Sequence, residues 1–344
     1  MKLPERINSE SELDDLLADP SPADVECVAG LSGDVLILGA GGKIGPSLAR
    51  RIHRAVTRAG SAARVIAASR FSSPDVRAGL DAEGIGTIAC DLLDEREIAA
   101  LPRSASILLL AGRKFGTLDR TELTWATNTI VPARVAAHFS QSRVVVFSTG
   151  NVYPMVPAEG PAPAETDLPA PIGEYAQSCL GRERIIEFYS RQAGMPAVIF
   201  RLNYAVDLRY GVLVDIARSV FSGEPIDLTI GFVNAIWQGD ANSYALRSLA
   251  LCATPPAMLN VTGPERISVR ETAEWFGGVF GRRPRFTGSE GPLALLSDSS
   301  RCRSLLGDPA VPLAVLRQWV AHWVRTGGSS LNKPTHFEVM DGRF

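Results

Sequence analysis

A glycine-rich segment that joins an apolar run to a helical pattern constrains the fold of this chain more than any other feature. The apolar run covers residues 34–38, the segment reads Gly39-Ala-Gly-Gly-Lys-Ile-Gly45, and the helical pattern covers 44–59. Backbone amides at the start of a helix bind phosphate oxygens, and glycines let a ligand come close to the backbone. A lone glycine pattern also fits a tight turn, but its place between a strand and a helix favours a site for the pyrophosphate of a dinucleotide.

Short apolar runs alternate with helical patterns over the first part of the chain, as in parallel sheets with helical crossovers. We expect strands at 34–38, 64–69, 87–91, 106–111, 143–148 and 197–201. Their β-branched and aliphatic residues show no polar alternation, which is typical of strands covered by helices on both faces. The sequence therefore predicts an α/β fold, a Rossmann-type doubly wound parallel sheet; a smaller C-terminal substrate-binding lobe is what the resemblance described below implies.

The sequence divides into four predicted parts. They are an N-terminal extension (1–32), a dinucleotide-binding Rossmann domain (33–202 plus 232–257), a substrate-binding lobe (203–231 plus 258–325) and a C-terminal tail (326–344). Beyond 201 the alternation loosens. There we expect a strand at 226–230, a helix over 240–252 and a strand at 258–262.

Composition argues against several classes of function. The net charge of −2 and the scattered arginines do not provide the basic footprint of a nucleic-acid binder. The apolar runs are strand-sized, and the acidic, polar residues 1–10 do not resemble a signal peptide, so we expect a cytoplasmic protein without a membrane segment. The five cysteines lack CxxC spacing and the four histidines lack HxxxH or HxH spacing, so we expect no metal site.

The end of the second predicted strand bears on the choice of cofactor. It reads Ser69-Arg70 and lacks the acid that would bind the ribose hydroxyls of NAD. Arg70 can pair with the 2′-phosphate of NADP, and Lys43 can add charge to the same site. We therefore expect NADP, with NAD as the alternative if Arg70 is an ordinary surface residue. Asp91-Leu92 ends the third strand, where the Asp91 carboxylate either accepts a hydrogen bond from the adenine amino group or caps a turn.

Further motifs follow the glycine segment in order. They are Asp91-Leu92, Ala111-Gly112 after the fourth strand, Asn128 within Thr127-Asn-Thr-Ile-Val-Pro-Ala133, Ser148-Thr-Gly-Asn-Val-Tyr-Pro154, Tyr175 and Arg201-Leu-Asn203. With these motifs, the chain from about Asp34 to Arg325 resembles the extended short-chain dehydrogenase/reductase family, also called the NAD-dependent epimerase/dehydratase family.

The resemblance implies a role for each matching residue. Tyr175 and Thr149 would form the catalytic pair, one transferring a proton and the other holding the substrate oxygen. The cofactor would be bound by Gly39, Gly41, Gly42, Lys43, Ile44, Gly45, Ser69, Arg70, Asp91, Leu92, Ala111, Gly112, Asn128, Ser148, Tyr175, Cys179 and Leu202. Candidate substrate contacts are Asn151, Asn203 and Tyr204.

One position departs from the family pattern. The resemblance places a lysine four residues after the tyrosine, where a cation favours the phenolate, and Cys179 stands there instead. Three interpretations stay open. Either Arg182 or Lys114 supplies the charge, or the substrate already carries an acidic proton, or the chain binds a dinucleotide without catalysis. Cys179 as a nucleophile lacks a histidine nearby in sequence, so we interpret it as a small packed residue.

The function that the resemblance implies is NAD(P)-dependent hydride transfer by an oxidoreductase or epimerase. Its substrate would be a sugar, a nucleotide sugar or a sugar-derived alcohol or ketone. The alternative is an NADP-binding sensor or scaffold of the same fold. The resemblance also implies a homodimer in which two long helices pack across a two-fold axis.

Overall fold

The central element is a parallel sheet of seven strands in the order β12-β7-β5-β4-β1-β2-β3. The computed structural model describes residues 3–114, 116, 119–333, 335–339 and 341–342. The seven strands are β1 (Val35–Leu38), β2 (Val65–Ser69), β3 (Gly86–Ala89), β4 (Ser106–Leu109), β5 (Arg143–Thr149), β7 (Ala197–Leu202) and β12 (Ala257–Val261). Each neighbouring pair is parallel, and the strand order reverses between β1 and β4. Such a reversal opens a crevice outside the carboxyl ends of the strands.

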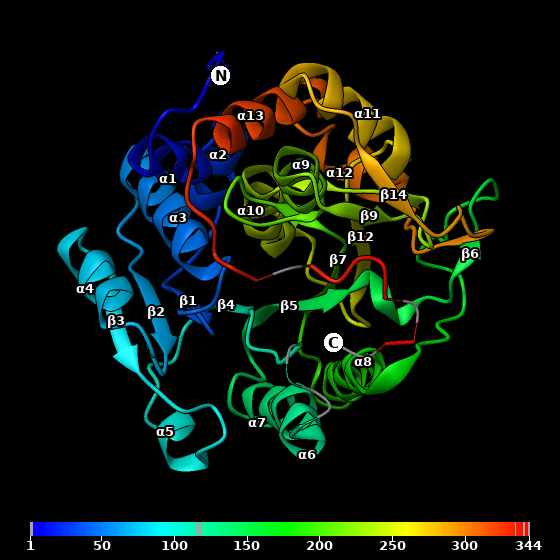
Figure 1. The fold of residues 1–344 in the computed structure, drawn as a ribbon. Coiled ribbons are helices and arrows are strands. Elements are labelled where there is room, and N and C mark those ends of the chain that lie inside the picture. The colour runs from blue at the N-terminus through cyan, green and yellow to red at the C-terminus, as the bar shows by residue number, and fades with distance from the viewer. Residues whose placement is uncertain (1–2, 115, 117–118, 334, 340, 343–344) are drawn as a thin grey trace.

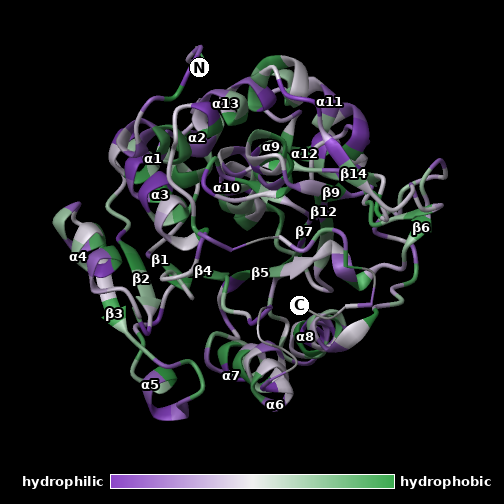
Figure 2. Cartoon of the chain, viewed as in Figure 1, coloured by the Kyte–Doolittle hydropathy of each residue, from purple (hydrophilic) through white to green (hydrophobic). Residues whose placement is uncertain are grey.

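Helices cover both faces of this sheet (Figure 1). On one face, Ile37 packs in a cluster with Leu48 of α3, and on the other, Leu36 packs with Val135 and Ile186 of α7 and α8. Most residues of the strands are apolar, and Figure 2 shows β1 and β2 mostly in the hydrophobic colour. The helices associated with the sheet are α3 (Gly45–Ala59), α4 (Pro74–Ala82), α5 (Glu95–Ala99), α6 (Thr121–Trp125), the π-helical turn η1 (Ala126–Ile130), α7 (Val131–His138), α8 (Gly173–Ala193), α10 (Gln238–Arg247) and the 3-10 turn η3 (Ser248–Leu251).

A second hydrophobic core forms the smaller lobe. It contains Val212 of α9, Phe276 of α11 and Trp319 of α13, together with Leu13 and Leu17 from the N-terminal extension. The remaining elements are α1 (Glu10–Ala18), α2 (Pro22–Ala29), η2 (Gly150–Val152), α9 (Val212–Ser222), α11 (Val269–Phe280), α12 (Ser300–Leu306), α13 (Leu313–Arg325) and four two-stranded sheets: β6 (Val156–Pro157) with β15 (Leu293–Ala294), β8 (Ala205–Val206) with β11 (Ile236–Trp237), β9 (Pro225–Asp227) with β14 (Arg285–Thr287), and β10 (Phe232–Val233) with β13 (Ile267–Ser268).

Two details differ from the sequence-based expectations. The strand expected at 258–262 in the second lobe is β12, which pairs with β7 at the edge of the main sheet, because Leu259 and Val261 belong to the core of that sheet. The strand expected at 226–230 ends at Asp227. In the N-terminal extension, α2 begins at Pro22 and is stabilised by a Ser21–Asp24 capping box.

The C-terminal tail is the red segment that crosses the front of the molecule in Figure 1, from α13 past the ends of β4 and β7 toward α8. Phe337 anchors it because this side chain is buried in the second core. The Thr335 amide and hydroxyl both donate to the Asp215 carboxylate, at 2.9 and 2.6 Å. Thr335 is therefore fixed against α9, which carries Asp215.

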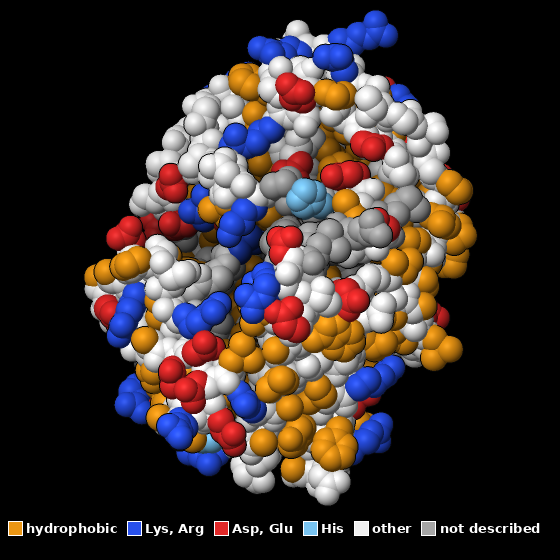
Figure 3. Space-filling model, turned by 60° about the horizontal axis from the view of Figure 1, so that its bottom comes forward, with side chains coloured by type: hydrophobic (Ala, Val, Ile, Leu, Met, Phe, Trp, Pro, Cys, Tyr) orange, Lys and Arg blue, Asp and Glu red, His pale blue; other side chains and the backbone are white. Residues whose placement is uncertain are grey.

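Apolar side chains gather on the lower half of the face in Figure 3, the side on which α6, α7 and α8 lie in Figure 1. Phe188 of α8 is 58% exposed and Ile130 of η1 is 45% exposed. These two residues define what we call the α8 apolar surface.

Candidate functional site

Two adjoining cavities lie at the carboxyl ends of the central strands. The first, of about 380 Å³, follows the glycine segment and is called the glycine-loop cavity. The second, of about 240 Å³, contains Tyr175 and is called the tyrosine cavity. Leu110 and Gly112 line both cavities, so the two form one continuous crevice. The crevice lies at the reversal of strand order, where this class of sheet binds its ligands.

Steric limits explain two glycines of the loop. Gly39 has a φ of +88°, and a Cβ placed on it would lie 2.6 Å from the amide nitrogen of Ala111. A Cβ on Gly45 would lie 2.2 Å from the carbonyl oxygen of Ala40. Only glycine lets the loop turn this tightly and lets α3 begin directly beneath it. The exposed amides of such a turn fit a pyrophosphate.

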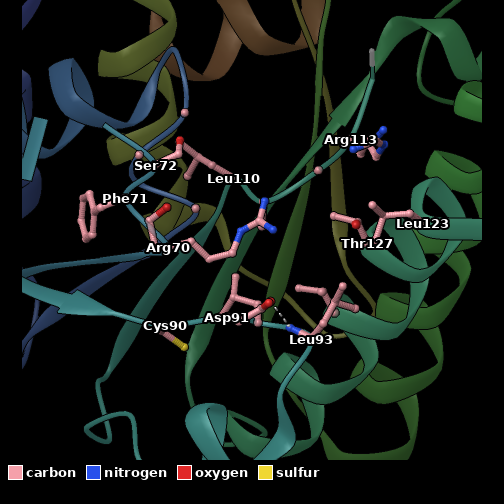
Figure 4. A pocket seen from close by; sticks show the side chains of 18 of the residues that line it. Arg70, Phe71, Ser72, Cys90, Asp91, Leu93, Leu110, Arg113, Leu123 and Thr127 are labelled. Carbon is pink, nitrogen blue, oxygen red and sulfur yellow. Dashed lines mark hydrogen bonds between the residues drawn. The ribbon is translucent and has the colours of Figure 1, made fainter. Parts of the chain in front are cut away.

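The glycine-loop cavity has a positively charged wall. Figure 4 shows the Arg70 side chain extending into it from the end of β2, near Asp91. Ser69, Gly41, Gly42, Leu92 and Ala111 also line this cavity, as the sequence predicted. The Asp91 carboxylate accepts a hydrogen bond from the amide of Leu93 at 2.9 Å, so it caps a turn. Asp91 also lines the cavity, so its contact with the adenine amino group stays a prediction.

Lys43 does not lie where the sequence predicted. It lines the tyrosine cavity, and its Nζ donates to the carbonyl oxygen of Ala205 at 3.1 Å and lies 3.8 Å from the centre of the Tyr210 ring. The expected position beside Arg70 is therefore wrong. The cause is local geometry: residue 43 follows the turn of the loop, so its side chain points toward the second lobe. Burial lowers the pKa of Lys43 to about 7.

Tyr175 and Thr149 meet in the tyrosine cavity. Thr149 ends β5 and Tyr175 lies in the first turn of α8, and their hydroxyl groups are within hydrogen-bonding reach of each other. The Thr149 hydroxyl also donates to the Asn151 side-chain oxygen at 2.9 Å. Burial raises the pKa of Tyr175 well above its ordinary value. The phenol therefore keeps its proton at neutral pH unless a nearby cation favours its ionised form.

A buried ion pair supports this end of β5. Glu183 of α8 pairs with Arg201 of β7 at 2.7 Å, and the two side chains are 0% and 1% exposed. The Ser148 hydroxyl donates to Glu183 at 2.5 Å, so it points toward α8 and forms part of this network. Arg201 also donates to the Tyr153 hydroxyl. The network fixes the strand that carries Thr149.

Three predicted site residues lie outside the lining of the two cavities. They are Gly45, Asn128 and Cys179. Asn128 accepts from the Arg113 amide at 2.9 Å and donates to the Ser178 hydroxyl at 2.9 Å, so it joins the loop after β4 to α8. Cys179 is 1% exposed and packs against Tyr175. Asn128 and Cys179 therefore pack beneath the residues that line the crevice.

The predicted substrate contacts Asn203 and Tyr204 follow β7. Asn203 donates to the Asn234 side-chain oxygen at 2.8 Å, which leaves it at the cavity wall in a fixed orientation. Tyr204 has a φ of +45° and a pKa that burial raises. These two residues, together with Ile44 and Leu202, line the tyrosine cavity as predicted.

Sequence reasoning missed several lining residues. Arg113 and Thr127 line the glycine-loop cavity. Two more come from the tail, Lys333 in the first cavity and Thr335 in the second. No local motif marks the tail residues, because only the path of the tail across the crevice brings them there.

A second lysine reaches the tyrosine cavity from the loop after β4. The Lys114 Nζ donates to the Thr335 carbonyl oxygen at 3.4 Å and lies 6.0 Å from the centre of the Tyr175 ring. Burial lowers the pKa of Lys114 to about 8. Lys43 and Lys114 thus bring two cationic side chains to the substrate side of the cavity.

Metal ligands and membrane spans are both absent from the described part of the chain. The described residues contain no group of three or more His, Cys, Asp or Glu side chains arranged to hold a metal ion. No helix among them combines the length and the apolar character needed to cross a membrane.

The sheet order, the glycine turn and the crevice define a Rossmann-type dinucleotide-binding protein. A model of the NAD dependent epimerase/dehydratase family matches residues 35–206, and the chain belongs to this family. It is therefore assigned to a family of enzymes that use a nicotinamide dinucleotide. A comparison with curated protein sequences finds no match.

Solved structures share the fold at low sequence identity. UDP-glucose 4-epimerase of Thermus thermophilus, in complex with NAD, has a TM-score of 0.69 at 18% identity, covering 85% of this chain and 99% of that one. UDP-glucuronic acid 4-epimerase of Bacillus cereus, in complex with UDP-glucuronic acid and NAD, has a TM-score of 0.71 at 16% identity, with coverage of 85% and 99%. UDP-Glc/GlcNAc 4-epimerase of Campylobacter jejuni has a TM-score of 0.69 at 21% identity, with coverage of 86% and 99%.

Proposed function

We propose that this protein is an NAD(P)-dependent oxidoreductase or epimerase that transfers a hydride at a carbinol or ketone carbon of a nucleotide sugar. The observation that carries the proposal is the meeting of the Tyr175 and Thr149 hydroxyls in a cavity continuous with the glycine turn. A bound nicotinamide dinucleotide would supply the hydride acceptor or donor. The residues of the chain then have only proton transfer and positioning to perform.

Tyr175 is the proton-transfer group in this proposal. As an alcohol is oxidised, the Tyr175 oxygen takes the proton of the substrate hydroxyl, and it returns that proton when a ketone is reduced. The Thr149 hydroxyl, which accepts from the Asn151 amide and donates to the Asn151 side-chain oxygen, would turn its single proton to the same substrate oxygen when substrate binds. Asn203, Tyr204 and Lys43 line the far wall, where the sugar would lie.

The nucleotide-sugar class is supported by the named structural neighbours, which bind or act on UDP-sugars. It is also supported by the continuous crevice, which has room for a sugar beside the nicotinamide position. The test is a screen of UDP- and dTDP-sugars for product by mass spectrometry and for absorbance change of the nicotinamide.

Tyr175→Phe is the decisive variant. Because a positioned proton-transfer group contributes about 100- to 10,000-fold to rate, kcat should fall by at least about 100-fold while dinucleotide affinity changes little. Tyr189→Phe, on the same helix and outside both cavities, is the matched control. Full activity of Tyr175→Phe would remove Tyr175 from the mechanism.

For the cofactor, we propose a preference for NADP over NAD, with Arg70 binding the 2′-phosphate. The direction of the Arg70 side chain into the glycine-loop cavity supports this. A hydrogen bond to a charged group contributes about 1.5–3 kcal/mol, so Arg70→Ala should weaken NADPH binding by roughly 10- to 100-fold and leave NADH binding nearly unchanged. Arg77→Ala, on α4, is the control. Equal loss for both dinucleotides would contradict the preference.

A binding protein without turnover is the second candidate. The raised pKa of Tyr175 and the neutral Cys179 thiol beside it favour this alternative. NADPH binding by fluorescence titration, combined with absence of product across the screen, would support the sensor and contradict the enzyme.

We further propose a homodimer formed through the α8 apolar surface defined by Ile130 and Phe188. Burying a large apolar side chain contributes about 1.5–3 kcal/mol. Phe188→Glu should therefore shift a dimer to monomer in sedimentation velocity, whereas Leu331→Glu, on the tail, should not. A monomeric wild-type protein would refute the proposal.

A further inference from the structure

The proton chemistry proposed for Tyr175 requires a positive charge near its oxygen. Burial is the largest effect on the pKa of this phenol and holds it far above neutral pH, and the charge of Arg182 lowers that pKa only in part. One helical turn further along α8 stands Cys179, whose own pKa is raised by burial, so it remains a neutral thiol. A cation must therefore come from another position.

Arg182 has the reach to supply it. The residue lies seven positions after Tyr175 on α8, and side chains of a helix slant toward its N-terminal end. The guanidinium consequently extends back up the helix and lines the tyrosine cavity. The small Cys179 side chain at the intervening turn leaves room for it.

The guanidinium is held rigidly. Its Nη1 donates to the carbonyl oxygen of Phe147 at 2.6 Å, and its Nη2 donates to the Asn128 side-chain oxygen at 2.6 Å. Phe147 lies in β5, two residues before Thr149. A Cβ on Gly112 would lie 2.7 Å from Nη2, so a glycine at that position makes room for the cation at the edge of both cavities.

The positive charge of Arg182 is not cancelled by a carboxylate. Its hydrogen-bond partners, Phe147 and Asn128, are neutral, and no acid among the described residues forms an ion pair with it. The neighbouring Glu183 is committed to Arg201. A guanidinium does not lose its proton in proteins, so the charge persists over the whole working pH range. Its field lowers the pKa of both Tyr175 and Cys179.

We infer that Arg182 is the positioning residue that moves Tyr175 toward its ionised form, the form that accepts and returns a proton. The inference rests on the proposed function of Tyr175. In the oxidation step the substrate O–H bond breaks and its proton forms a new O–H bond on the Tyr175 phenolate. The adjacent C–H bond breaks with its electron pair passing to the bound dinucleotide. Arg182 stabilises the phenolate before the step and touches neither reacting atom.

The test measures the ionisation of Tyr175 without turnover. Protein labelled with ¹³Cζ-tyrosine and saturated with NADP⁺ is titrated by NMR from pH 6 to 11, and Tyr175→Phe assigns the signal. Arg182→Met should move the midpoint upward by at least about one pH unit, a tenfold change in proton affinity. Arg182→Gln, which is neutral but keeps a donor for Asn128, gives the same test if Arg182→Met fails to fold.

Two more variants complete the design. Cys179→Lys/Arg182→Met returns a cation one turn from Tyr175 and should bring the midpoint back toward the wild-type value. Arg184→Met, on the same helix in an exposed pair with Glu187, should leave it unchanged. In turnover, the loss caused by Arg182→Met should be large at pH 7 and shrink as pH rises.

The outcomes separate the two proposals. A shifted midpoint without turnover of any sugar leaves the role of Arg182 standing and refutes the proposed function. Turnover with equal midpoints in wild type and both neutral variants overturns the role of Arg182. A wild-type Tyr175 signal that stays protonated to pH 11 also overturns it.

Discussion

The buried Glu183–Arg201 pair gives a sharp test of how the catalytic strand is held. Glu183 accepts three hydrogen bonds, from Arg201 Nε at 3.0 Å, from Arg201 Nη2 at 2.7 Å and from the Ser148 hydroxyl at 2.5 Å. Both side chains are essentially inaccessible to water. Replacing Glu183 by Met removes all three bonds and leaves a buried guanidinium whose remaining hydrogen bond goes to the Tyr153 hydroxyl.

The expected loss of stability follows from the uncompensated charge of Arg201. Breaking a fully buried pair by removing one partner lowers the free energy of unfolding by about 3–5 kcal/mol. The matched control is Glu187→Met on the same helix, whose pair with Arg184 is partly exposed and worth about 0–1 kcal/mol. Urea unfolding followed by circular dichroism compares the two variants.

A double variant distinguishes charge from packing. If the buried charge is the cause, Glu183→Met/Arg201→Met should be no less stable than Glu183→Met alone, because replacing both partners by apolar side chains is often close to neutral. Similar losses for Glu183→Met and Glu187→Met would refute the reasoning. A double variant that loses about the sum of both single losses would point to packing instead.

Three shorter predictions follow from other parts of the molecule. Gly45→Ala should strongly destabilise the fold and abolish dinucleotide binding because its Cβ would meet Ala40 backbone, whereas Gly278→Ala, which has open space, should stabilise α11 by about 0.5–1 kcal/mol in urea unfolding. The folded-state pKa of Lys43, lowered from 10.5 to about 7, means that its burial costs stability below pH 7 and that this cost is relieved as pH rises toward 10.5. The stability gained by Lys43→Met should therefore be larger at pH 6 than at pH 9, and an equal gain at both values would contradict it. Asp215→Ala removes both bonds to Thr335, so hydrogen-exchange mass spectrometry should show faster exchange of the tail amides, while Asp308→Ala should not change them.

Local sequence was enough to predict the Rossmann sheet and its glycine turn. The strands are short, apolar and separated by turns, and the glycines mark a turn that a side chain would block at Gly45. Sequence was not enough to assign β12 to its sheet. An apolar strand of five residues fits either lobe, and its pairing with β7 depends on contacts far apart along the chain.

The sequence likewise predicted some residues of the candidate site and missed others. Tyr175 and Thr149 carry recognisable neighbours in sequence, and the structure brings them together. The sequence places Lys43 in the glycine loop but does not predict the direction of its side chain. The Tyr210 ring and the Ala205 carbonyl determine that direction. No sequence motif predicts that Thr335 lines the cavity, because its position depends on the contacts of the tail with Asp215 and on the burial of Phe337.

For a long side chain, the position of its Cα along a helix does not determine where the end of the side chain lies. Seven residues of α-helix rise by about 10 Å, which by spacing alone separates Arg182 from Tyr175. The slant of helical side chains toward the N-terminus and the length of the arginine recover much of that separation. Arg182 can thus supply the charge that is missing at residue 179 only if the side chain of residue 179, which lies between Tyr175 and Arg182 on the helix, is small. Enlarging Cys179 to Leu should therefore displace the guanidinium and raise the ionisation midpoint of Tyr175, even though no charged residue has been changed. Cys179→Ala, which keeps the space open, should leave it close to the wild-type value.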